Sequence, residues 1–127
     1  LWLAADSARL AAAALVGTHD FASFCAAGGD AHGTIRTITR AEWIGAVGGD
    51  LRFEVEGPGF LRHMVRNLVG SLLEVGRGRR EPEWIATLLK QRDRTLAGPT
   101  APAHGIVMVR VEDGFPEGIR RVEATSA

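Results

Sequence analysis

The sequence predicts a single α+β domain, in which helices cover one face of an antiparallel sheet. The chain has 127 residues, enough for one domain with a buried core. Residues 51–56 alternate apolar and polar side chains, as a strand with one buried face does. Residues 61–75 carry apolar side chains at the spacing of an amphipathic helix. Strands joined by a short turn pair antiparallel, which leaves one sheet face for the helices.

The first predicted element is a helix near the start of the chain. Asp6 is suited to cap it and Gly17 to end it, with Leu10, Ala14 and Leu15 on its buried side. The Ala-rich composition of this stretch resembles that of a signal peptide. However, its charged residues, its helical spacing and the lack of a basic leading region favour a helix of the folded domain.

A strand pair is predicted next. Residues 18–24 are expected to form a turn or a short helical piece, and residues 25–33 a Gly-rich loop. Residues 34–47 are rich in Thr and Ile and predict a strand, which a turn at residues 48–50 connects to the strand at residues 51–56.

The alternation in residues 34–47 is imperfect. Ile38 and Ile44 share parity with the charged Arg36, Arg40 and Glu42, so charged and apolar side chains would point the same way. We therefore expect a bulge, or a loop of more than two residues, in this part of the sheet.

The helix predicted over residues 61–75 has the clearest pattern in the chain. Its polar face carries Arg66 at mid-helix and Gly70 one turn later. A glycine inside a helix costs about 1 kcal/mol relative to alanine, so its presence indicates a close approach by another group. One interpretation is a guanidinium that points into a cleft; the other is an exposed arginine on a solvated face. The apolar stripe consists of Leu61, Met64, Val65, Leu68, Val69 and Leu72.

The remaining chain predicts a helix, a loop, a strand and a tail. Gly76 ends the amphipathic helix and Pro82 suits the first turn of the next one. Residues 92–105 predict a loop and residues 106–111 a last strand. Residues 114–127 have little to bury and predict a flexible tail, so the folded domain is expected to span residues 1–113.

Positive charge in this chain is almost entirely arginine. The chain has fourteen arginines and one lysine, Lys90, and its formal net charge is +0. A neutral chain has no overall field that attracts nucleic acid. Guanidinium groups suit phosphates and stacked bases better than ammonium groups do, whereas a GC-rich genome would also favour arginine. Composition leaves both explanations open.

Other kinds of site have little support. The four histidines and Cys25 have no zinc-ligand spacing, so no metal is expected. Cys25 is the only cysteine, which excludes an internal disulfide and fits a reducing cytoplasm. His19 and Asp20 could form a dyad, but capping of a short helix explains Asp20 more simply. No apolar run reaches the length of a membrane span.

Residues 60–76 read FLRHMVRNLVGSLLEVG. This string resembles a helix in the C-terminal half of the tRNA pseudouridine synthase A family. Further stretches resemble that family's motifs in the same order, so the resemblance spans about residues 10–111. These are residues 17–21 (GTHDF), Arg36, residues 83–85 (EWI), residues 92–97 (RDRTLA) and residues 98–103 (GPTAPA).

The resemblance implies an isomerase that converts uridine to pseudouridine in the anticodon arm of tRNA, without cofactor or metal. The target nucleotide has to leave its stack. The family's essential aspartate lies in an Arg-Thr-Asp-Ala-Gly motif, which this chain lacks. We therefore expect a C-terminal half that is inactive without the N-terminal half. Arg66 matches the arginine that pairs with the aspartate, and such a fork keeps a carboxylate ionised and oriented.

Arg66 is thus the candidate catalytic residue, in support of an aspartate from elsewhere. The expected partners are tRNA, the N-terminal half and a second copy of the full-length protein, in the cytoplasm and without a membrane. The alternative is a stand-alone, non-catalytic RNA-binding module of the same fold. The candidate RNA-binding residues are Arg36, Arg62, His63, Arg77, Arg79 and Arg80.

Overall fold

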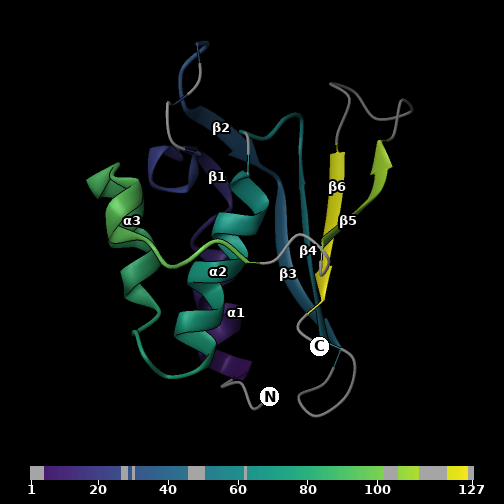
Figure 1. Ribbon diagram of the computed structural model, residues 1–127. Coiled ribbons are helices and arrows are strands. Elements are labelled where there is room, and N and C mark those ends of the chain that lie inside the picture. The colour runs from purple at the N-terminus through teal and green to yellow at the C-terminus, as the bar shows by residue number, and fades with distance from the viewer. Residues whose placement is uncertain are drawn as a thin grey trace.

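The computed structural model describes residues 5–26, 29, 31–45, 51–61, 63–101, 106–111 and 120–125. These residues form helices on one side of an antiparallel sheet (Figure 1), which confirms the predicted α+β class. In chain order the elements are α1 (Ala5–Ala13), β1 (Gly17–Asp20), η1 (Ala22–Phe24), β2 (Ile35–Ile38), β3 (Arg40–Gly45), β4 (Leu51–Gly57), α2 (Met64–Gly76), α3 (Glu83–Gln91), η2 (Arg94–Leu96), β5 (Ile106–Val111) and β6 (Arg120–Thr125).

Two sheets are formed by the described residues. The larger has the strand order β3-β4-β6-β5, and the smaller pairs β1 with β2; every pairing is antiparallel. The predicted strand over residues 34–47 is divided into β2 and β3 at Thr39, where the chain changes partner from β1 to β4. The Thr39 amide and hydroxyl both donate to the Glu56 carbonyl, at 2.8 and 3.1 Å. The imperfect alternation thus reflects a change of partner strand at Thr39 and no bulge within β2 or β3.

The charged side chains of β3 and β4 pair with one another. Arg40 Nη1 donates to Glu54 and Glu56 at 2.8 and 3.2 Å, and Arg52 Nε donates to Glu54 at 3.1 Å. Burial alone would lower the pKa of the Arg40 guanidinium. The hydrogen bond to Glu54 and the nearby carboxylates outweigh this effect, so that the pKa is raised. Cross-strand pairing thus explains how Arg40 is accommodated in a strand, and Glu42 pairs with Arg40 along the same strand at 3.1 Å.

The core lies between the helices and the sheet. All six apolar residues predicted for the stripe of α2 are buried, and they pack with Phe21, Phe24, Phe53, Ile85 and Leu88. The prediction for α1 was wrong in one respect: Leu10 is 64% exposed. Leu15, just after the helix, is buried as predicted, but the buried side of α1 itself consists of Ala8, Ala11 and Ala12, whose small side chains let α1 approach α2 and β3 closely.

The C-terminal part differs from the predicted tail. Residues 120–125 form β6, which pairs with β4 on one side and β5 on the other. The pairing satisfies backbone groups along β4 that would otherwise form an edge. The segment has few apolar residues, so its composition did not indicate this strand. The turn at residues 48–50 lies outside the described residues. The boundary at residue 113 stays a prediction.

In the described part of the chain, none of the helices has both the length and the apolar character that crossing a membrane requires.

Candidate functional site

The polar face of α2 is covered by the segment that follows α3. This segment, residues 93–101, is called the strap below; it crosses in front of α2 in Figure 1. Asn67, Gly70 and Ser71 of α2 are buried although they lie on the side away from the main core. The polar face is therefore a contact surface for the chain's own loop, and Arg66 lies at its border, half-buried.

Gly70 is needed where the strap crosses. A Cβ at Gly70 would collide with the Pro99 carbonyl, and a Cβ at Gly98 would lie 3.1 Å from the Gly70 carbonyl oxygen. The Gly98 amide also donates to Ser71 Oγ at 3.0 Å. The close approach predicted from the glycine is thus present, and its cause is the strap backbone rather than a ligand.

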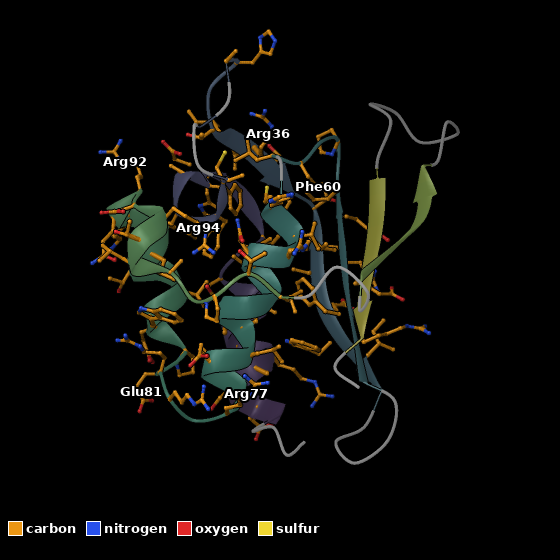
Figure 2. The ribbon with its side chains drawn as sticks, in the orientation of Figure 1. Arg36, Phe60, Arg77, Glu81, Arg92 and Arg94 are labelled. Atoms are coloured by element: carbon orange, nitrogen blue, oxygen red, sulfur yellow. The ribbon has the colours of Figure 1, made fainter. Side chains whose placement is uncertain are left out.

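Three side chains link the strap to the centre of α2. Asn67 Oδ1 accepts from Thr100 Oγ1 at 2.6 Å and from Arg94 Nη2 at 3.1 Å. Arg94 Nη2 also donates to Thr100 Oγ1 at 2.9 Å, and its Nη1 donates to the Gly98 carbonyl at 2.8 Å. Asn67 Nδ2 donates to the Phe24 carbonyl at 2.8 Å. Figure 2 shows Arg94 between α3 and α2. This closed network fixes the end of the strap against the helix.

Arg66 is held directly by the last residue of the strap. Its Nε donates to the Ala101 carbonyl at 2.9 Å, and the Ala101 amide donates to the Arg66 carbonyl at 3.1 Å. Its two Nη groups make no hydrogen bond or ion pair with any residue in the described ranges. A guanidinium carries five N–H donors in a planar fork. The contact with Ala101 therefore sets the plane of the fork and leaves its Nη edge available.

The start of the strap is anchored separately. Ser23 Oγ donates to the Leu88 carbonyl at 2.6 Å and accepts from the Asp93 amide at 2.8 Å. Asp93 Oδ1 caps η2 by accepting from the hydroxyl and the amide of Thr95, and these two bonds lower the pKa of the Asp93 carboxyl. The strap is thus attached at both ends.

Two of the predicted RNA-binding residues lie near the N-terminal end of α2. His63 is exposed, immediately precedes the helix, and has a left-handed backbone with φ of 58°. Figure 2 shows Arg36, on β2, and Phe60 beside this end of the molecule. Arg36 Nη1 donates to the carbonyls of Ile35 and Gly33 at 2.7 and 3.2 Å. Arg62 lies outside the described residues.

The other three predicted RNA-binding residues lie at the opposite end of α2. Arg77, Arg79 and Arg80 are exposed, and Figure 2 shows Arg77 at the far end of the helix from Arg36. Arg79 pairs with Glu74 at 3.2 Å, and the Arg80 guanidinium lies 4.9 Å from the Trp84 ring centroid. A helix of 13 residues at 1.5 Å per residue separates His63 from Arg77 by roughly 20 Å.

The weaker candidates from the sequence are explained by local structure. Asp20 Oδ1 accepts from the Ala22 amide and the Thr34 hydroxyl, and His19 Nε2 bonds to the Val16 carbonyl, so the two side chains form no dyad. Cys25 is buried. Among the described residues, no three of His, Cys, Asp and Glu gather as metal ligands would.

A groove of about 490 Å³ lies between α1 and β3, and it is separate from Arg66. Arg9, Val16, Arg40 and Trp43 are among the residues that line it, and no predicted site residue does. Trp43 Nε1 is buried and has no hydrogen-bond partner in the described part of the chain.

A family model described as tRNA pseudouridine synthase matches residues 11–112, which include α2, α3 and the strap. The chain belongs to the tRNA pseudouridine synthase family. This confirms the family that the motifs of the sequence indicated.

Individual members of the family are closely similar to the chain. The tRNA pseudouridine synthase A of Myxococcus xanthus is 47% identical over 113 residues, 87% of this chain and 43% of the relative. That of Geobacillus kaustophilus is 53% identical over 97 residues, 76% of this chain and 37% of the relative. That of Exiguobacterium sibiricum is 48% identical over 103 residues, 81% and 41% respectively. The chain thus spans about two fifths of the length of these synthases.

The sequence indicated Arg66 but not the residues that hold it. Residues 92–97 and 98–103 matched motifs of the synthase family, yet nothing assigned a role to Arg94 or Thr100. The signal that could have found them is Asn67, a polar residue in the interior of an amphipathic helix beside Arg66 and one turn before Gly70. A buried amide needs partners, and the Gly-Pro-Thr stretch offers backbone and hydroxyl groups.

Proposed function

We propose that the full-length protein isomerises uridine to pseudouridine in the anticodon arm of tRNA, and that this chain forms one wall of its active site. Family membership and the names of the relatives support the proposal. The motifs quoted above extend over α3 and over α2 and the strap, the two segments that carry and hold Arg66.

The reaction breaks the bond between ribose C1′ and uracil N1, turns the base, and joins C1′ to C5. The proton on C5 leaves to solvent and N1 takes one up, so the balance needs no oxidant, reductant or cofactor. A catalytic carboxylate has to remain ionised beside the ribose, and a neighbouring guanidinium favours that state.

Arg66 carries the proposal for this chain. The residue is half-buried, its Nε is fixed by Ala101, and its Nη edge is open within the described residues. Two parallel N–H donors match the two oxygens of a carboxylate. We propose that Arg66 binds the catalytic aspartate, which the part of the full-length protein outside this chain supplies.

The partners follow from the same proposal. Arg36 and His63 at one end of α2 and Arg77, Arg79 and Arg80 at the other are proposed to contact the tRNA backbone, as arginine forks commonly do. We further propose that the full-length protein works in the cytoplasm as a homodimer, as its resemblance to synthase A enzymes suggests.

Release of tritium from tRNA labelled at C5 of uridine tests the proposal, because only replacement of the C5 hydrogen frees the label. The full-length protein is expected to release it, and this chain alone is expected to release none. Mixing the chain with the separately produced remainder should restore release. Turnover by the chain alone would mean that the catalytic site is a different one. RNA binding without tritium release by the full-length protein would support the alternative of a non-catalytic RNA-binding module.

A further inference from the structure

The open edge of Arg66 depends on where the Ala101 carbonyl lies. With Nε donating to that oxygen at 2.9 Å, the fork can offer a carboxylate only its Nη1 and Nη2 donors. A carboxylate that approached through Nε and one Nη would have to displace Ala101. The strap therefore selects one of the two bidentate arrangements open to an arginine.

The position of Ala101 depends in turn on the residue before it. Thr100 Oγ1 bonds to Asn67 and Arg94, at 2.6 and 2.9 Å. Asn67 is the neighbour of Arg66 on α2, and it is buried. The network thus ties strap residue 100 to helix residue 67, just as the backbone ties residue 101 to residue 66.

We propose that Thr100 and Arg94 are positioning residues, which orient Arg66 through the strap so that its Nη edge faces the catalytic carboxylate. This inference rests on the proposed function of Arg66. An arginine side chain has many rotamers, and a misplacement of about 1 Å can cost a factor of 100 in rate. A fixed strap removes that freedom before the substrate binds.

Thr100 offers the cleanest test because it is exposed and a valine there keeps its shape. Thr100→Val in the full-length enzyme removes the hydroxyl from the network. We expect kcat to fall about 10-fold, the size expected for one lost hydrogen bond, with KM for tRNA within about twofold of wild type. Thr100→Ser restores the hydroxyl and is expected to recover most of the lost kcat.

Thr87 supplies a matched control. It is also exposed, and its hydroxyl also donates to a carbonyl, that of Glu83 at 3.2 Å, but it lies on α3 away from the network. Thr87→Val should leave both kcat and KM unchanged. Both variants replace an exposed, hydrogen-bonded threonine with valine. If this kind of substitution lowered activity only by destabilising the protein, both variants would lose activity.

A double-mutant cycle shows whether Thr100 acts through Arg66. Arg66→Lys keeps the charge but lacks the fork, so it should leave reduced activity for comparison. If Thr100 orients the fork, adding Thr100→Val to Arg66→Lys should lower kcat much less than it does in the wild-type background. Arg94→Lys, which cannot bridge Gly98, Asn67 and Thr100 together, should lower kcat at least as much as Thr100→Val.

The possible outcomes separate this inference from the proposed function. Absence of turnover by the wild-type enzyme would reject the function itself. An active wild type with Thr100→Val as active as Thr87→Val would overturn the positioning role and leave the function intact. A change in KM alone would also overturn it, since it would make Thr100 an RNA contact. Additive losses in the cycle would show that Thr100 acts independently of Arg66.

Discussion

In the N-terminal half of α2, Arg66 donates to a backbone carbonyl, and buried Asn67 and Gly70 lie beside it under the strap. At the C-terminal end of the same helix, Arg77, Arg79 and Arg80 are exposed; the Arg79 side chain forms an ion pair with Glu74, and the Arg80 guanidinium lies over the Trp84 ring. The first region contains one guanidinium in a fixed direction. The second contains more charge with little restraint.

The difference bears on what each region can do. A guanidinium with a fixed orientation selects a carboxylate that approaches in one direction. Because it is already oriented, no free energy is spent on reorienting it during the reaction. Exposed arginines are held by contacts worth little individually, so they can adapt to phosphates along a nucleic acid. Positive charge alone therefore does not distinguish the two ends of this helix; the restraint on Arg66 does, and it marks the end that we propose to be reactive.

The largest expected effect comes from removing the fixed fork. Arg66→Ala in the full-length enzyme should lower kcat by about 1000-fold or more, because a preorganised charge at the reacting centre is lost. Tritium release under single-turnover conditions measures this, and circular dichroism checks folding. Alanine is the better helix former, so the fold should persist. Near wild-type release would make Arg66 an ordinary surface residue.

A smaller effect is expected from displacing the strap. Gly70→Ala gains about 1 kcal/mol of helix propensity, but its methyl group collides with the Pro99 carbonyl. Overpacking of this kind typically costs about 1–3 kcal/mol, so we expect a net loss in the free energy of unfolding. The kcat should fall as well, because Ala101 moves away from Arg66.

Gly59→Ala is the control for this substitution, since a Cβ there meets nothing within 4 Å. Urea unfolding of both full-length variants gives the comparison. Equal stability and equal kcat of the two would mean that the strap yields without consequence, which would contradict the restraint on Arg66.

The smallest effect is expected at the basic end. Replacing Arg77, Arg79 and Arg80 together with glutamine should raise KM for tRNA several-fold and leave kcat unchanged. The salt dependence of binding should flatten by roughly 0.7 to 0.9 in logarithmic slope for each phosphate that an arginine no longer neutralises. Lys90→Gln, in the last turn of α3, is the control and should change neither quantity. A fall in kcat without a change in KM would contradict the proposed division of roles.

The sequence predicted the parts of the fold that strong periodicity specifies. The stripe of α2, the alternation of β4 and the proline at the start of α3 are local signals, and the structure agrees with each. Two strands were missed: β1, where residues 18–24 were expected to form a turn or a short helical piece, and β6. Both are formed by pairing with distant strands, which no local pattern in their own residues indicates.

From the sequence, the candidate site could be predicted only as Arg66, whose catalytic role stays a prediction, and as a close approach at Gly70, which the structure confirms. Gly70 indicated a close approach, but no local pattern says that residue 99 arrives there from beyond α3. Leu10 was misplaced for a related reason: helical spacing identifies faces, while the choice between an alanine face and a leucine face depends on the neighbour. Interactions between distant segments therefore explain most of what the sequence did not predict.

A structure of the full-length enzyme bound to tRNA tests the role of Arg66 most directly. We predict that both of its Nη groups lie within about 3 Å of the two oxygens of an aspartate from the remainder of the protein. Its Nε should still bond to the Ala101 carbonyl. An Arg66 that points to solvent, or one that has exchanged Ala101 for the carboxylate, would contradict this prediction.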